Sequence, residues 1–116
     1  MQRKSYEYRK KEYEQRFEAK TPVEFLKYHG HIISEADLKM LKELHKIGLK
    51  SGVINVLLEY VLVVSRDRIL HPLVIELARY WFSQSITSVE HATEYVTEEL
   101  KKYVKGLENN RQSPDA

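Results

Sequence analysis

The 116-residue sequence predicts an all-α fold, a compact bundle of about five or six mostly short helices. Only four glycines and three prolines are present, whereas an all-β chain needs a turn signal about every 8–12 residues. Apolar residues recur instead at helical spacing, most regularly over residues 70–81. Ser or Thr residues also stand before three of these stretches, where they can cap a helix N-terminus. Together these observations favour helices throughout.

Residues 1–20 form a charged segment, which we interpret as a linker or extension helix. It holds seven basic and four acidic residues, and Tyr6, Tyr13 and Phe17 share one helical stripe. A solvated linker helix, or a coiled segment joining two protomers, fits this composition better than a DNA site, because glutamates dilute the positive charge. No N-cap precedes the stripe, so we expect the sequence to be one piece of a larger protein.

Residues 21–107 are predicted to form the folded domain, beginning with two capped helices. Thr21, Pro22 and Glu24 form a capping box with proline in the first turn, and the short helix they begin ends before Gly30. Ser34 is the expected N-cap of a second helix that ends at Gly48. The apolar stripe predicted for this second helix comprises Leu38, Leu41, Leu44 and Ile47.

The middle of the chain is the most apolar part. Residues 52–64 are apolar nearly all round, interrupted by Asn55 and Glu59, which indicates a buried central element. Its β-branched end could equally form a strand, but its length and helical surroundings favour a helix. A polar turn at 65–68 separates it from a helix that begins at His71-Pro72. The inward residues predicted there are Leu70, Leu73, Val74, Leu77, Ala78 and Trp81.

The last predicted helix begins at Thr87-Ser88-Val89-Glu90, a second capping box. Its acidic start and basic end both complement the helix dipole. Residues 108–116 are predicted to be a disordered tail, because the sequence ENNRQSPDA lacks apolar residues that could pack. The inward residues predicted for this helix are Val89, Ala92, Val96, Leu100 and Tyr103.

The residue patterns argue against an enzyme. The chain has no cysteine, and its five histidines show no spacing typical of a zinc site. There is no glycine-rich phosphate loop, and Ser and Thr residues fall mainly at helix caps. We therefore expect no catalytic residues, no metal and no cofactor. The sequence has no secretory signal and no apolar run of about 20 residues, which predicts a cytoplasmic protein.

Several stretches resemble one known family over roughly residues 20–104. They are SEADL at 34–38, GL at 48–49, GVINVLLEYVL at 52–62 and ITSVEHA at 86–92. These stretches resemble the C-terminal domain of the Gram-positive DnaB/DnaD replication-initiation and helicase-loading family. The run at 55–61 is more similar to the DnaB branch. The family's signature Tyr-x-x-x-Ile-x-x-x-Trp falls on Leu73, Leu77 and Trp81, of which only the tryptophan is identical.

This resemblance implies a helical, non-enzymatic module of the primosome. Such a domain binds single-stranded DNA and helps to load the replicative helicase. The implied partners are single-stranded DNA, the helicase loader and other primosome proteins, with a possible homo-oligomer and membrane association only through the full-length protein. The alternative is a protein-interaction or oligomerisation module of the primosome that does not bind DNA directly.

The candidate nucleic-acid-binding residues are Lys101, Lys102, Tyr103, Lys105, Arg79 and Trp81. An aromatic residue among lysines suits a surface that follows the phosphate backbone and stacks on bases. The same lysines also suit a helix C-terminus, and Glu98 is spaced for a surface pair with Lys102. Trp81 could stack on a base, but its position on the apolar stripe favours core packing.

Charge restricts where such a surface can lie. The net charge of +2 divides into +3 for residues 1–20, +1 for 21–50, 0 for 51–85 and −2 for 86–116. Affinity for DNA cannot come from the total charge, so it has to come from a local cluster. The sequence therefore predicts a small and terminal DNA-binding surface.

Overall fold

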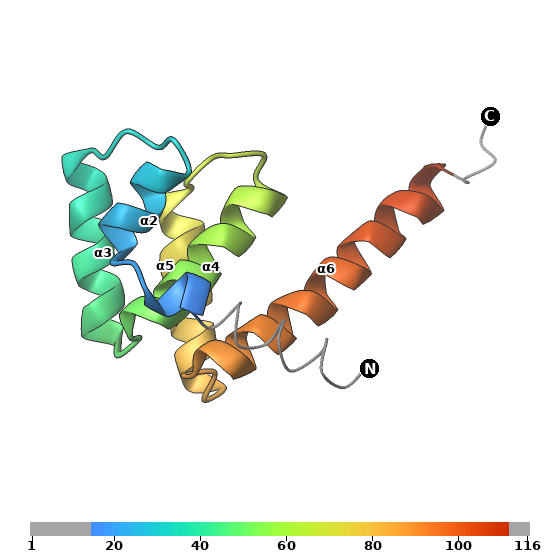
Figure 1. Cartoon of the computed structure of the whole chain (residues 1–116). Helices are drawn as coiled ribbons and strands as arrows, with labels where there is room; N and C mark the ends of the chain where they lie inside the picture. Colours follow the sequence, from blue (N-terminus) through green and yellow to red (C-terminus); the bar gives the residue numbers. More distant parts are fainter. Residues whose placement is uncertain (1–14, 112–116) are drawn as a thin grey trace.

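The computed structural model describes residues 15–111, and every regular element in this range is a helix (Figure 1). A helical turn at residues 15–18 precedes the first labelled helix. The predicted all-α class is confirmed. The helices are α2 (Pro22–Tyr28), α3 (Glu35–Ile47), α4 (Ser51–Val64), α5 (His71–Ser83) and α6 (Val89–Arg111).

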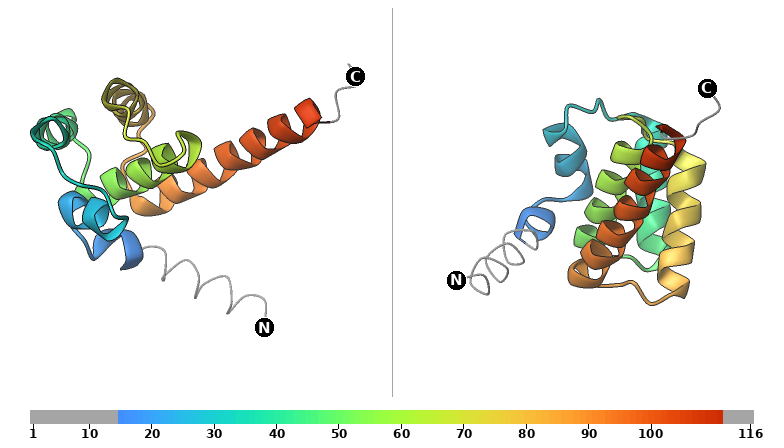
Figure 2. Two further views of the ribbon diagram at one scale, coloured as in Figure 1. Left: turned by 90° about the horizontal axis from the view of Figure 1, so that it is seen from above. Right: turned by 90° about the vertical axis from the view of Figure 1, so that its right-hand side faces the viewer.

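Helix α4 lies at the centre of the bundle. It packs against α2, α5 and α6, while α3 packs against α5. Seen from above in Figure 2, α6 begins beside α4 and then extends beyond the other helices. The molecule therefore consists of a packed body and one projecting helix.

The apolar segment at 52–64 forms a helix, as predicted. All seven residues from Gly52 to Leu58 are buried, and so are Val61 and Leu62. Burying one such aliphatic side chain contributes about 1.5–3 kcal/mol. A helix buried nearly all round has to be covered on several sides, which explains why three other helices pack against α4.

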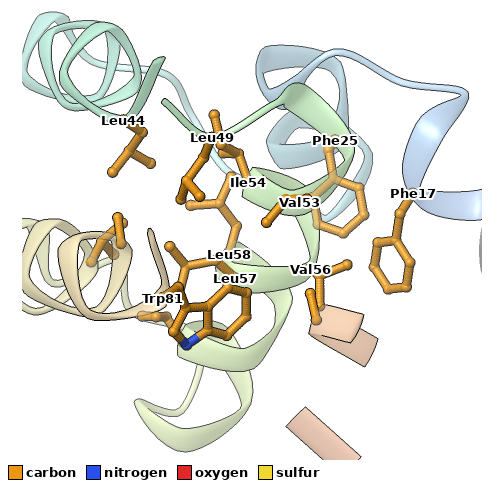
Figure 3. Close-up of a cluster of buried hydrophobic side chains, with 14 of the residues drawn as sticks. Phe17, Phe25, Leu44, Leu49, Val53, Ile54, Val56, Leu57, Leu58 and Trp81 are labelled. Atoms are coloured by element: carbon orange, nitrogen blue, oxygen red, sulfur yellow. The ribbon is translucent and has the colours of Figure 1, made fainter. Parts of the chain in front are cut away.

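Trp81 lies in the core that α4 forms with α5. Its side chain is fully buried, and Figure 3 shows its indole ring beside Leu57 and Leu58. The ring also meets Tyr95 of α6 edge to face, with centroids 5.8 Å apart. The prediction that Trp81 is a packing residue is confirmed.

The folded domain begins before residue 21. Phe17 is buried and packs against Phe25, with ring centroids 5.9 Å apart. The buried amide of Asn55 donates hydrogen bonds to the carbonyl oxygens of Phe17 (2.9 Å) and Lys20 (2.8 Å). Residues 15–20 therefore pack on the domain rather than forming a free linker, and the helical turn at 15–18 agrees with the alternative of an extension helix. The remaining part of this segment, residues 1–14, lies outside the described residues.

Helix caps follow the sequence closely. The capping boxes Thr21–Glu24 and Ser34–Asp37 are both present. Gly48 ends α3 with φ +118°, a conformation that L side chains rarely adopt. At α6, however, the Ser88 hydroxyl accepts the hydrogen bond from the His91 amide (3.1 Å), so the cap lies one residue later than the predicted box.

Three residues predicted to point inward are exposed instead. Leu38 is 44% exposed, because α3 turns Met40, Leu41 and Leu44 inward. Leu70 is 43% exposed, because it precedes α5 as its N-cap. Tyr103 is 40% exposed on the projecting part of α6.

The predicted tail begins too early. Helix α6 continues to Arg111, so residues 108–111 are helical rather than part of a disordered tail. Backbone hydrogen bonds can extend a helix through a polar stretch of sequence. Residues 112–116 lie outside the described range. No helix in the described part of the chain combines the length and the apolar character needed to cross a membrane.

Candidate nucleic-acid interface

The predicted basic cluster lies on the projecting end of α6. Residues 101–108 are all exposed and include Lys101, Lys102, Lys105 and one acidic residue, Glu108. At about 100° per residue, Lys101 and Lys105 lie on the same side of the helix, whereas Lys102 lies about a quarter-turn away. Because the neighbouring helices do not surround this part of α6, the lysines can be approached from several directions (Figure 1).

Two of these lysines are near glutamates of the preceding turn. Lys101 Nζ lies 3.4 Å from Glu98 Oε1, and Lys102 Nζ lies 4.0 Å from Glu99 Oε2. The sequence predicted a Glu98–Lys102 pair, so the observed pairs differ by one residue. Exposed pairs of this kind contribute at most about 1 kcal/mol and are easily exchanged for another anion. Lys105 forms no ion pair with any described residue.

Tyr103 lies between the lysines and is partly exposed. Its ring is available at the surface, as base stacking requires, and Val104 beside it is 51% exposed. Lys101, Lys102, Tyr103 and Lys105 therefore share one helical segment, as the sequence predicted. They form the basic segment of α6, and this name is kept below for these four residues.

Arg79 does not belong to this cluster. Its guanidinium Nη2 lies 3.7 Å from Glu43 Oε1, so it connects α5 to α3 on the body of the molecule. Figure 1 shows that the end of α6 extends away from these two helices. The prediction grouped Arg79 with the lysines by charge alone, and the fold separates them.

Trp81 cannot contact a base in this fold. Its side chain has no exposed surface, so stacking on DNA would first require the α4–α5–α6 core to open. Leu73 and Leu77, the other two positions of the family signature, pack partly buried against the same core. The three signature positions therefore serve packing, and the assignment of Trp81 to a DNA surface is corrected.

A tyrosine and glutamate cluster supports the base of the projecting segment. Burial raises the pKa of Tyr95, and the neighbouring Glu99 carboxylate raises it further. Burial likewise raises the pKa of Tyr60 of α4, again with a contribution from Glu99. Both hydroxyls therefore stay protonated near neutral pH. Glu99, two residues before Lys101, therefore acts on a tyrosine of α4 as well as on one of α6.

The structure also contains a polar cluster that the sequence did not predict. Asp37 is buried, and its Oδ1 lies 2.6 Å from Nε2 of His71, while its Oδ2 lies 3.0 Å from Nε2 of His31. Oδ2 also accepts a hydrogen bond from the Ser34 amide (2.9 Å). Burial alone would raise the pKa of Asp37, but hydrogen bonds from His71, Ser34 and His31 together hold that pKa well below its usual range.

This cluster joins three parts of the fold. The loop before α3, the first turn of α3 and the first turn of α5 all contact one carboxylate. No group of three or more His, Cys, Asp or Glu side chains within the described residues could hold a metal ion. Both Nε2 atoms face Asp37, so we interpret the cluster as a structural link. The only related sequence prediction was Ser34 as the N-cap of this helix, which says nothing about a histidine 34 residues after Asp37.

A hollow on the body provides a less suitable anion site. It has a volume of about 430 Å³ and lies beside the turn at residues 15–18 and the end of α4. Arg16 faces it, but its Nη2 already lies 2.9 Å from Glu59 Oε2, and Asp67 lines the same space. The two carboxylates would repel a phosphate, which leaves the basic segment of α6 as the better candidate.

Comparison with protein-family models, with curated proteins and with solved structures finds no match for this chain.

Proposed function

We propose that this chain is a non-enzymatic module of DNA replication initiation that binds single-stranded DNA and helps to load the replicative helicase. The observation that carries the DNA-binding part is the basic segment of α6, three lysines around a partly exposed tyrosine on a projecting helix. The lysines would follow the phosphate chain while Tyr103 stacks on an unpaired base. The role in helicase loading is supported by the resemblance to the DnaB/DnaD family.

The packed body would then serve as a scaffold. It fixes the first half of α6 through α4 and through the edge-to-face contact of Tyr95 with Trp81. A helix held at one end presents its other end to a flexible strand without covering it. This arrangement suits an unstructured ligand, because single-stranded DNA can wrap around a projecting element.

A salt series tests this proposal directly. Fluorescence anisotropy of labelled oligo-dT should show binding that weakens steeply with salt, with a log–log slope of about −2 if three lysines each neutralise one phosphate. Duplex DNA of equal length should bind more weakly, because its bases are not free to stack. Absence of oligo-dT binding at low salt would contradict the proposal.

Charge reversal locates the surface. The triple variant Lys101→Glu, Lys102→Glu, Lys105→Glu should lose at least about tenfold in oligo-dT affinity, because three favourable phosphate contacts become repulsive. The matched control is Lys39→Glu, Lys42→Glu, Lys46→Glu on α3, which changes the net charge equally at exposed positions. Equal loss in both variants would indicate a general charge effect and exclude the α6 segment as the site.

The second candidate is a protein-interaction module of the primosome that does not bind DNA. It is favoured by the near-neutral total charge and by the ion pairs that occupy Lys101 and Lys102. The same titration separates the two candidates, because this module would show no salt-dependent binding to oligo-dT.

A further inference from the structure

We propose that a second copy of this chain docks antiparallel on the exposed apolar stripe of α6. The stripe consists of Leu100, Tyr103, Val104 and Leu107. Leu100 is partly buried, whereas Tyr103, Val104 and Leu107 are 40%, 51% and 47% exposed. The inference concerns how two copies associate and does not depend on DNA binding.

The stripe continues a face that is buried earlier in the same helix. Val89 and Ala92 are buried, and Val96 packs partly buried against the core. At 100° per residue the four stripe residues cover an arc of about 100°, the width of a packing face rather than of scattered surface residues. The apolar face of α6 therefore extends beyond the part of the helix that the body covers.

The spacing of the stripe is self-complementary, which favours a second copy over a different partner. In an antiparallel pair with its two-fold axis between residues 103 and 104, Leu100 lies level with Leu107 of the second copy. Tyr103 then lies level with Val104 of the second copy. Every apolar residue thus meets another apolar residue, as an isologous interface requires.

Charges beside the stripe are also complementary in this arrangement. Lys101 and Glu108 lie on the same side of α6, next to Val104. Across the two-fold axis, Lys101 is offset from Glu108 of the second copy by two residues, about 3 Å along the helix, which a lysine side chain can span. The pair occurs twice because of the symmetry. Lys102 and Lys105 lie away from the stripe and stay in solvent.

The interface is small, so the dimer is expected to be weak. Stable complexes bury about 1,200–2,000 Å² in total, and four apolar side chains from each copy provide less. A shallow hollow lies along one side of the stripe and leaves room for side chains of the second helix. It is lined by Leu100 and Val104 of the stripe and by Thr97, Lys101, Lys105 and Glu108 beside it. The expected behaviour is a concentration-dependent monomer–dimer equilibrium.

Sedimentation velocity on the full chain over a concentration series tests the proposal. The wild type should shift toward dimer as concentration rises, and Val104→Glu with Leu107→Glu should remain monomeric. The matched control is Ile32→Glu with Val63→Glu, which removes two exposed apolar residues outside α6 and should dimerise like the wild type. A wild type that is monomeric throughout, or a control that is equally impaired, would overturn the proposal.

Charge exchange tests the register. Lys101→Glu alone and Glu108→Lys alone should each weaken the dimer by about tenfold, because each places two pairs of like charges across the interface. The double variant should recover the wild-type dissociation constant. If the double variant stays as weak as the single variants, these two residues do not face each other.

Cysteine cross-linking tests the orientation, since the natural chain has no cysteine. In the antiparallel pair, two copies of Leu107→Cys place their sulfurs seven residues apart, about 10 Å, too far for a disulfide. An equimolar mixture of Leu100→Cys and Leu107→Cys chains should instead form a mixed disulfide on mild oxidation. Efficient cross-linking of Leu107→Cys to itself would indicate a parallel pair and contradict the proposal.

Anisotropy with oligo-dT separates this proposal from the proposed function. Below the dimerisation concentration, the uncharged variant Val104→Ser, Leu107→Ser, which also removes the apolar stripe but adds no negative charge beside the lysines, should retain at least half of the wild-type affinity per monomer. Loss of dimerisation with retained binding shows that DNA binding does not require the dimer, even though Lys101 and Tyr103 belong to both surfaces. A wild type that dimerises without binding DNA would leave the dimer proposal standing and reject the DNA proposal.

Discussion

One buried carboxylate connects the elements at the end of the body where α3 and α5 begin. Asp37 caps α3 locally through the Ser34 amide and reaches His71 at 2.6 Å and His31 at 3.0 Å. A buried charge is stable only when such partners replace its lost hydration. Three elements are therefore held at one point by the ionised form of a single side chain.

Asp37→Asn should lower the free energy of unfolding by about 2–3 kcal/mol at pH 7, because charge-assisted hydrogen bonds become neutral ones. The pKa of Asp37 is lower in the folded than in the unfolded state, so its contribution is complete above the unfolded pKa near 4 and declines as the pH falls. The difference between wild type and variant in urea unfolding should therefore shrink between about pH 5 and pH 2.

The control for this prediction is Asp67→Asn. Asp67 is exposed in the loop after α4 and has φ +67°, which asparagine also tolerates. The free energy of unfolding of the Asp67→Asn variant should stay within about 0.5 kcal/mol of the wild-type value at pH 7. If the difference in unfolding free energy between the wild type and Asp37→Asn did not change with pH, it would contradict the view that the ionised Asp37 carboxylate connects these elements.

The part of this cluster that could be predicted from sequence is the local part. The Ser34–Asp37 hydrogen bonds follow from a spacing of three residues at a helix start. The His71 contact spans 34 residues, and no periodic pattern encodes which side chains meet over such a separation. For the same reason the sequence grouped Arg79 with the lysines, although its partner Glu43 lies on α3.

At the scale of helices, two glycines show how closely α4 and α6 approach. A Cβ on Gly52 would lie 2.7 Å from Val89 Cγ2 and 3.0 Å from Glu18 Cγ. A Cβ on Gly106 would meet no atom within 4 Å. Gly52 therefore permits the first turns of α4 and α6 to touch, whereas Gly106 lies in the projecting part of α6.

Gly52→Ala should lower the free energy of unfolding by about 1–3 kcal/mol, because the added methyl displaces a packed valine and overcomes the helix-propensity gain. Gly106→Ala is the matched control and should raise helicity slightly, since alanine is favoured over glycine by about 1 kcal/mol within a helix. Urea unfolding and far-ultraviolet circular dichroism measure the two effects. Stabilisation by Gly52→Ala would show that α4 and α6 separate easily.

Helix positions were predictable because the caps and stripes are local signals. The apolar segment at 52–64 had an alternative strand interpretation, and its length resolved this correctly. The prediction for α6 agreed less fully with the structure. Its periodic stripe predicted Tyr103 to be inward, but α6 has 23 residues and α4 only 14. Periodicity identifies the apolar face of a helix but cannot say where the neighbouring helix ends.

At the scale of the whole molecule, we expect the body to determine the stability of the protein and the end of α6 to bind DNA. Removal of residues 101–116 deletes residues 101–108, which are all exposed, together with the residues that follow them, and leaves the buried part of α6 in place. The truncated protein should unfold with a free energy within about 1 kcal/mol of the wild type, while binding of oligo-dT is lost. Urea unfolding and anisotropy on the same preparation measure both quantities. Loss of several kcal/mol would place the end of α6 inside the cooperative core.

The hydrogen bonds of the Asn55 amide limit the order in which parts of the fold can dock during synthesis. Its two acceptors, the carbonyls of Phe17 and Lys20, lie 38 and 35 residues earlier in the chain. During synthesis they leave the ribosome before Asn55 does, so these two carbonyls cannot receive their hydrogen bonds from Asn55 until α4 has emerged, although Phe17 can already pack against Phe25 of α2. The turn at 15–18 is therefore held by all of its partners on α2 and α4 only after α4 has been made, although it precedes both helices in the chain.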